Sequence, residues 1–252
     1  MQADHYDAMR GTEDTHWWYV GNRAIVQGLL HRVLGPAPAG APPRRTLDAG
    51  CGTGRNLVWH AELGQAHGLD REPLALAHCR ARGHERLVRG SLVELPFADG
   101  SFDLVTCFEV LYHRAVTDWQ GTIGGLARLV RPGGVLLLRE PAFPFLFGDH
   151  DQVVHGARRF RRREFRAAVA ATGLQIERCS YQNVVTFLPA LLVRSLQRVR
   201  GTKASSAHGD LGHDPGLIGR LLAKVLGAER HWLRFANLPF GSSVLCVARR
   251  PL

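Results

Sequence analysis

Two acids and three glycines carry the clearest chemical signal in this chain of 252 residues. Asp48 ends a short apolar run and is followed by glycines at positions 50, 52 and 54, while Asp70 ends the next strand-like run. Glycine lets the backbone turn sharply and come close to a ligand. An acid at the end of the following strand can accept hydrogen bonds from both hydroxyls of a ribose. The arrangement therefore predicts a site for a cofactor that contains a nucleoside.

The spacing of the glycines separates two classes of cofactor. A dinucleotide fingerprint reads G-x-G-x-x-G, and its third glycine would fall at position 55, which is Arg55. The chain reads G-x-G-x-G instead, led by Asp48, and this form resembles motif I of the class I S-adenosylmethionine-dependent methyltransferases. The resemblance implies that Asp48 orients the loop around the methionine part of the cofactor and that Asp70 holds the ribose. Cys51, inside the loop, is interpreted as a small residue that fills space.

Three further passages resemble the same family. Residues 91–103 are similar to a passage that ends in D-G-S-F-D, residues 108–113 to the exit of the fourth strand, and residues 131–134 read R-P-G-G before the fifth strand. Ser91 stands where the family usually has an acid that meets the adenine amino group, so we expect this contact to be weaker or made by the backbone. Tyr112 likewise stands in place of an acid.

Residues 16–23, which read HWWYVGNR, resemble an N-terminal helix that covers the cofactor pocket in one subset of these enzymes. Arg23 would then pair with the methionine carboxylate. Core packing of an N-terminal helix explains Trp17, Trp18 and Tyr19 equally well. The residues assigned to S-adenosylmethionine, which would leave as S-adenosylhomocysteine, are Arg23, Asp48, Gly50, Cys51, Gly52, Asp70, Arg71, Ser91, Leu92 and Phe108.

Histidines near the expected strand ends are the candidates for catalysis. Ligands of open α/β sheets bind outside the carboxyl ends of the strands, and His113 follows the fourth predicted strand while His155 lies in the loop after the fifth. A hydroxyl or amine acceptor needs a base to take its proton, and histidine suits this role because its unperturbed pKa is about 6.5. The competing interpretation of His113 is a residue that only supports its loop.

The loop after the fifth strand is expected to border the acceptor. His150 is an alternative base there and Arg159 a clamp for an anionic group, whereas the competing interpretation is a solvated, charged turn. No metal is expected, because His150, Asp151 and His155 lack an evident further ligand. The residues predicted to contact the acceptor are Trp18, Tyr19, Tyr112, His150 and Arg159.

Strand and helix patterns alternate from residue 46 to about 181, which predicts an α/β fold with a doubly wound, mostly parallel sheet of seven strands. Residues 1–45 are expected to form an N-terminal helical lid and a linker, and residues 46–252 the domain that binds the cofactor. A helical cap over the acceptor is expected at about 187–228, inserted before the last strand. The polar segment 201–215 within the cap is predicted to be mobile.

Composition limits the partners. The net charge is +10, but the basic residues are nearly all arginine, with lysine only at positions 203 and 224, and genome composition alone can produce this bias. We therefore expect a small-molecule substrate and no nucleic-acid partner, while contact with a membrane surface stays open. Five cysteines without a C-x-x-C pattern and no secretory signal favour reduced thiols and a cytoplasmic location. A monomer or a homodimer is expected.

These features predict methyl transfer to an oxygen, nitrogen or carbon atom of a small molecule, with anionic or amphiphilic metabolites as candidates. An RNA or protein methyltransferase stays open, although the chain has no Asn/Asp-Pro-Pro-aromatic run after the fourth strand and no Pro-Cys nucleophile. A non-catalytic scaffold or regulatory subunit that binds the cofactor also stays open. A dinucleotide oxidoreductase is opposed by the glycine spacing and by the lack of any lysine before position 203.

Overall fold

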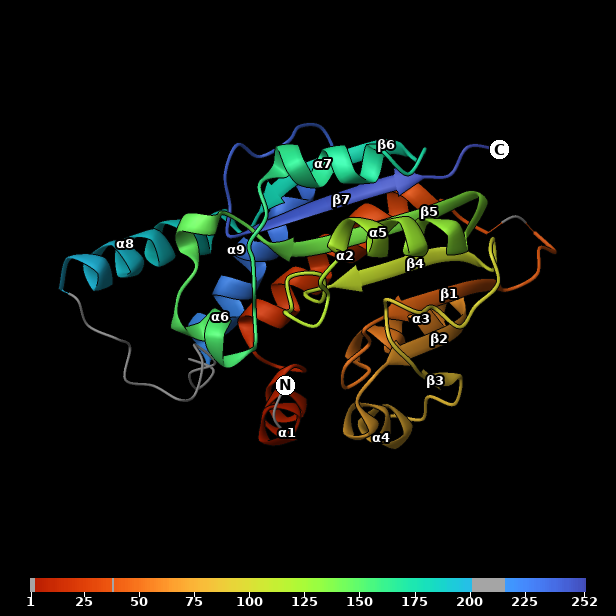
Figure 1. The fold of residues 1–252 in the computed structure, drawn as a ribbon, viewed down its shortest axis with the longest axis horizontal. Helices are drawn as coiled ribbons and strands as arrows, with labels where there is room; N and C mark the ends of the chain where they lie inside the picture. The colour runs from red at the N-terminus through yellow and green to blue at the C-terminus, as the bar shows by residue number, and fades with distance from the viewer. Residues whose placement is uncertain (1–2, 38, 201–215) are drawn as a thin grey trace.

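The computed structural model describes residues 3–37, 39–200 and 216–252 and has a seven-stranded sheet at its centre (Figure 1). The strand order is β3-β2-β1-β4-β5-β7-β6, with β7 antiparallel to β5 and β6 and all other pairs parallel. This topology confirms the predicted doubly wound, mostly parallel sheet. The strands are β1 (Arg44–Ala49), β2 (Gly64–Asp70), β3 (Leu87–Arg89), β4 (Phe102–Phe108), β5 (Val130–Pro141), β6 (Gln175–Gln182) and β7 (Ser243–Arg249).

Helices cover both faces of the sheet. Three of them were not predicted from the sequence: the short helices α1 and α6 and the 3-10 helix η1. The helices are α1 (Ala3–Thr12), α2 (Trp17–Leu34), α3 (Arg55–Leu63), α4 (Pro73–Ala81), α5 (Trp119–Leu129), η1 (Pro144–Leu146), α6 (Asp149–Val153), α7 (Arg162–Ala170), α8 (Val184–Arg200) and α9 (Leu217–Leu233).

Two hydrophobic clusters show how the layers are divided. One cluster joins the sheet to α5 and α7, which lie in front of the strands in Figure 1. The other joins α2, α9 and Trp59 of α3 to the opposite side of β4, β5 and β7. The sheet is therefore buried between two helical layers, as parallel sheets of this class require.

Strand β5 carries two charged residues to the edge of the sheet where a ligand would bind. Its residues 135–138 are Val-Leu-Leu-Leu and are fully buried, which suits a central strand covered on both faces. The run then continues into Arg139 and Glu140, which are buried as well. Two charged side chains thus stand at the carboxyl end of a core strand, the edge at which ligands of α/β sheets bind.

The N-terminal helix α2 belongs to the core as much as to a lid. It buries Ile25 and Leu29 against the sheet. It also packs closely on α9, because a Cβ atom added at Gly21 would lie 2.7 Å from Cδ2 of Leu226. The same contact brings most of α9 into the helical layer, so that α8 is the part of the expected cap that stands apart in Figure 1. The division at residue 45 stays a prediction.

Other expectations concern the thiols and the long polar segment. The five cysteines are free and buried, and the Sγ atoms of Cys51 and Cys79 lie 3.8 Å apart. The segment 201–215, predicted to be mobile, lies outside the described residues. Within the described ranges, none of the helices has the length and apolar character needed to cross a membrane.

Candidate active site

The glycine loop after β1 has a backbone that other residues would strain. Gly50, Gly52 and Gly54 have φ angles of 81°, 53° and 81°, in the left-handed region that favours glycine. A Cβ atom at Gly50 would also clash with the side chain of Val110, and one at Gly54 would lie 2.8 Å from Sγ of Cys79. The loop can therefore approach both a ligand and its own neighbours closely.

Asp70 fixes this loop from the end of β2. Its Oδ2 atom accepts a hydrogen bond from the backbone N–H of Gly52 at 2.9 Å, and Oδ1 accepts one from Glu72 N–H at 3.0 Å. The side chain lies in the wall of the main cavity. Burial raises the pKa of the Asp70 carboxyl, although the backbone donors oppose the shift. A carboxylate held in this way can accept hydrogen bonds from ribose hydroxyls.

Asp48 acts from behind the loop. The side chain is 1% exposed and is not among the residues that line the cavity. Its Oδ1 atom accepts a hydrogen bond from Oγ1 of Thr106 at 2.7 Å. Burial raises the pKa of Asp48 to about 7. The geometry thus favours support of the loop over direct contact with a cofactor.

One cavity of about 1030 Å³ brings nearly all the predicted site residues together. Asp48 is the exception, for the reason just given. The cavity is larger than most ligand pockets, which measure about 300–1,000 Å³. The predicted residues that line it are Trp18, Tyr19, Arg23, Gly50, Cys51, Gly52, Asp70, Arg71, Ser91, Leu92, Phe108, Tyr112, His113, His150, His155 and Arg159.

The N-terminal segment closes one side of the cavity, with contributions that the sequence motifs did not reveal. Tyr6, Met9 and Glu13 all line it. Glu13 is 4% exposed, and its Oε1 atom accepts hydrogen bonds from Thr53 Oγ1 at 2.6 Å and from Arg82 at 2.5 Å. These contacts fasten the segment to the glycine loop.

Arg23 forms hydrogen bonds with the same N-terminal segment. Its guanidinium donates to the carbonyl oxygens of Glu13 and Asp14 at 2.6 and 3.3 Å. Burial lowers the pKa of Arg23 to about 10, so the group stays charged at neutral pH. Its pairing with a methionine carboxylate stays a prediction.

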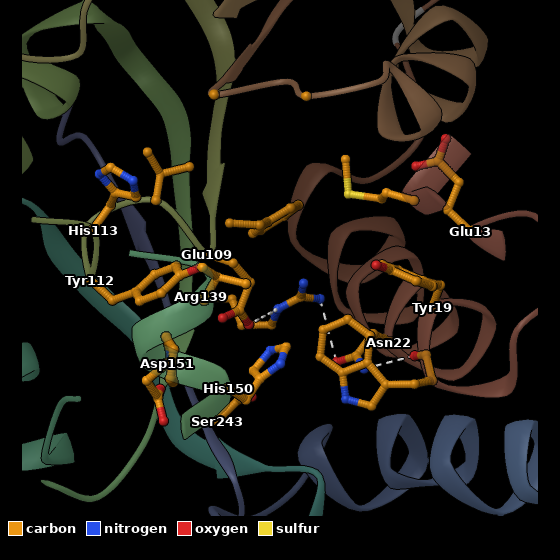
Figure 2. A pocket seen from close by; sticks show the side chains of 18 of the residues that line it. Glu13, Tyr19, Asn22, Glu109, Tyr112, His113, Arg139, His150, Asp151 and Ser243 are labelled. Atoms are coloured by element: carbon orange, nitrogen blue, oxygen red, sulfur yellow. Dashed lines mark hydrogen bonds and ion pairs between the residues drawn. The ribbon is translucent and has the colours of Figure 1, made fainter. Parts of the chain in front are cut away.

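An ion pair that was not predicted stands at the middle of the cavity (Figure 2). Arg139 at the end of β5 donates to Glu109 just after β4 at 3.2 Å, and both residues line the cavity. The guanidinium lies 5.0 Å from the ring centre of Phe108 and 5.6 Å from that of Trp18. It also donates to Oδ1 of Asn22 at 3.4 Å. Charged residues directly after apolar strands were the sequence signal that could have found this pair.

Glu140, next along β5, holds the backbone that follows β4. Its carboxylate accepts hydrogen bonds from the N–H groups of Val110, Leu111 and Tyr112 at 3.0, 2.8 and 3.1 Å. Glu140 is fully buried, and burial raises its pKa well above the usual range. Glu109, just before this turn, has a φ angle of 56°, which is strained for a residue with a side chain. One buried acid therefore sets the position of Tyr112 and of the backbone facing the cavity.

The hydrogen bonding of His113 differs from that expected of a general base. Its Nδ1 atom accepts a hydrogen bond from the N–H of Ala115 at 3.1 Å. In the neutral ring the proton then sits on Nε2, which can donate but not accept. Burial lowers the pKa of His113 to about 4, so the ring is neutral at pH 7. The ring lies 5.9 Å from that of His155, whose φ angle is 58°.

Arg159 is not a free clamp for anions. Its Nε and NH2 groups donate to the two carboxylate oxygens of Asp151 at 2.8 and 3.0 Å, and a further bond reaches the carbonyl of Ala142. Asp151 is 1% exposed, so this bidentate pair is largely removed from water. The charge of Arg159 is therefore balanced within the protein, and its contact with an anionic acceptor stays a prediction.

His150 is the third histidine in the cavity wall. Figure 2 shows its ring pointing toward the middle of the cavity, on the same side as the Arg139 guanidinium. Among the described residues, no group of three His, Cys, Asp or Glu side chains is arranged to hold a metal ion.

Comparisons with known proteins agree with this geometry. A family described as "Methyltransferase domain" matches residues 47–138. The malonyl-[acyl-carrier protein] O-methyltransferase of Serratia marcescens is 30% identical over 231 residues, which cover 86% of this chain and 80% of that relative. The demethylmenaquinone methyltransferase of Geobacillus kaustophilus is 34% identical over 115 residues, 42% of this chain and 48% of the relative. Apart from the Serratia protein, the chain spans about half the length of such curated relatives.

A solved structure is similar over nearly the whole chain. It is a Haloferax volcanii complex between the Trm112 methyltransferase activator and a methyltransferase partner, with a TM-score of 0.58 and 20% identity. The match covers 99% of this chain and 94% of that one. At this level of identity it shows the shared fold. The Serratia relative and the match to the methyltransferase family establish that the chain, with its glycine loop, belongs to the class I S-adenosylmethionine-dependent methyltransferases.

Proposed function

We propose that the acceptor is a small molecule with an apolar portion, which binds in the half of the cavity beyond Glu109. The observation that carries this proposal is the lining of that half. Leu146 of η1 and Pro189, Ala190 and Val193 of α8 give apolar side chains to the wall of the cavity that also holds the Glu109–Arg139 pair. Apolar walls with a few convergent polar groups are typical of small-molecule sites.

The first half of the cavity fits the cofactor. The glycine loop leaves room for a close approach, and the buried Asp70 carboxylate supplies an acceptor for ribose hydroxyls. S-adenosylmethionine bound there would supply a methyl group that its sulfonium already activates for transfer. The protein's main task is to hold donor and acceptor in line and to exclude water.

The side chains around the ion pair would orient the acceptor. Arg139 is held between Trp18 and Phe108 and by Glu109, so its position is fixed before a ligand binds. His113, with its proton on Nε2, would donate a hydrogen bond to the acceptor. His150 would take the proton of a hydroxyl or amine acceptor, which its direction into the cavity supports (Figure 2). His155 stays the alternative base.

The names of two relatives support a small acceptor group. One is a malonyl-[acyl-carrier protein] O-methyltransferase and the other a demethylmenaquinone methyltransferase. An RNA or protein acceptor remains a competing proposal, and the cytoplasmic location stays a prediction.

A labelling experiment tests the class of acceptor. The protein is incubated with methyl-tritiated S-adenosylmethionine and a cell extract, which is then separated into lipid, aqueous metabolite, protein and nucleic-acid fractions. We expect label in the lipid or metabolite fraction, and no label with Asp70→Ala. Label confined to protein or nucleic acid would overturn the proposal.

Substitutions of the histidines test their roles once an acceptor is known. His150→Gln is expected to lower kcat by about 100-fold or more while the affinity for S-adenosylmethionine stays unchanged. His113→Gln should have the smaller effect, because glutamine can also donate a hydrogen bond. A larger loss in His113→Gln, with a pH profile that loses one ionisation, would make His113 the base instead.

A further inference from the structure

Helix α9 has a second apolar face that the fold does not use. Its inward face buries Leu226 and Leu233 against α2 and the sheet. On the outer side, Leu221, Val225 and Trp232 follow one another at helical spacing and are 61%, 45% and 59% exposed. A helix that only covers a core has a polar outer face. The outer stripe of α9 therefore points to a partner.

Helix α8 repeats this pattern beside the cavity. Residues 184–193 contain no charged side chain, yet Leu188 and Leu192 are each 61% exposed. The neighbouring positions Pro189 and Val193 line the cavity, so the exposed face of α8 adjoins the face that borders the acceptor half. Figure 1 shows α8 standing away from the sheet. Leu222 of α9 lines the same cavity, so both helices border it.

The charges on these helices are almost all of one sign. Their sequences contain a single acid, Glu229. Its carboxylate is turned inward, where it accepts hydrogen bonds from the N–H groups of Asn183 and Val184 at 2.7 and 2.8 Å. Arg220 and Lys224 are exposed and lie along the edge of the α9 stripe. The outer surface thus combines apolar side chains, a tryptophan and cations.

We propose that this α8–α9 surface docks on an anionic lipid bilayer. Apolar side chains that enter the region between headgroups and acyl chains, with Lys and Arg beside them at the phosphates, are the signature of a helix that binds in the plane of a membrane. A second copy of the chain fits less well, because a symmetric contact would bring the same cations together. The surface is formed by Leu188, Leu192, Leu196, Leu217, Ile218, Leu221, Val225 and Trp232, with Arg220 and Lys224.

Docking here would place the mouth of the acceptor half next to the bilayer. A lipid-soluble acceptor could then pass from the membrane along α8 into the cavity. This consequence rests on the proposed function, whereas the docking itself does not. The test therefore measures membrane binding without any acceptor, and S-adenosylmethionine binding is measured separately by calorimetry.

Co-sedimentation with vesicles tests the apolar stripe. The full chain is expected to sediment with vesicles of equal parts phosphatidylcholine and phosphatidylglycerol, and much less with phosphatidylcholine alone. Leu188→Gln/Leu192→Gln and Leu221→Gln/Val225→Gln should each weaken binding about tenfold or more, because two apolar side chains no longer leave water. The matched control Val58→Gln/Val93→Gln, which alters two exposed valines elsewhere, should bind like the wild type.

Two double substitutions of basic residues test whether vesicle binding depends on the cations beside the stripe or on the net charge of the whole protein. Arg220→Gln/Lys224→Gln should reduce binding to the anionic vesicles, whereas Arg80→Gln/Arg86→Gln, with the same change in net charge at exposed positions elsewhere, should not. Added salt should weaken wild-type binding. Equal effects of the two charge pairs, or no sedimentation with anionic vesicles, would overturn the proposal. So would a dimer in light scattering that the Leu188→Gln/Leu192→Gln pair dissociates.

Discussion

The two halves of the cavity are built in different ways. In the proposed cofactor half, most of the predicted cofactor contacts come from residues 50–92, and bonds within this stretch, such as that from Gly52 to Asp70, fix them. In the acceptor half, Arg139 meets Asn22, which is 117 positions away in the chain, and the wall comes from α8. Local backbone geometry thus shapes the proposed donor site, and tertiary packing shapes the proposed acceptor site.

The largest expected effect is at the boundary between the halves. Glu140→Ala leaves three N–H groups without an acceptor, two of them buried and that of Val110 partly buried, and a buried unsatisfied group costs about 1–3 kcal/mol. We expect the free energy of unfolding to fall by about 3–6 kcal/mol, measured by urea denaturation. Such a loss would mean that one long-range contact holds the backbone that both halves share.

Glu140→Gln is the matched control. Its amide oxygen can still accept, so the loss of stability should be clearly smaller and the affinity for S-adenosylmethionine nearly normal. An equally small loss in Glu140→Ala would show that the backbone after β4 is held locally, which would break the contrast between the two halves.

A pH dependence is expected in the cofactor half. Burial raises the pKa of Asp48 from 3.8 to about 7. Between these values the unfolded chain has lost the proton that the folded chain keeps, so stability falls as pH rises. The contribution is fully present below about pH 4 and is lost toward pH 7, by up to about 4 kcal/mol.

The measurement compares unfolding free energies of the wild type and Asp48→Asn from pH 4 to pH 7, without cofactor. Asparagine preserves the shape and the hydrogen bond from Thr106 but does not titrate. The wild type should lose stability relative to the variant as pH rises. Parallel curves would mean that Asp48 is ionised throughout, and the buried support for the loop would need another explanation.

The difference between local and long-range contacts also explains which parts of the fold and of the site could be predicted from the sequence. The glycine loop, Asp70 and the strands that flank them were predicted because their signals are local: turn residues, apolar runs and an acid at a strand end. The Glu109–Arg139 pair was missed because its partners are 30 residues apart and meet only in the folded sheet. Arg159 was predicted to bind an anion because its own partner, Asp151, could not be identified from spacing. The hydrogen bond from Ala115 N–H to Nδ1 of His113 could not be predicted from the sequence either.

The proposed function places donor and acceptor in separate halves of one cavity. Calorimetric titration with S-adenosylhomocysteine of the wild type, Asp70→Ala and Ala190→Phe tests it most directly. Asp70→Ala removes a charged hydrogen-bond partner worth about 1.5–3 kcal/mol and should weaken binding roughly 10- to 150-fold. Ala190→Phe fills only the apolar half and should bind like the wild type. Equal losses in both variants, or none in Asp70→Ala, would contradict the account.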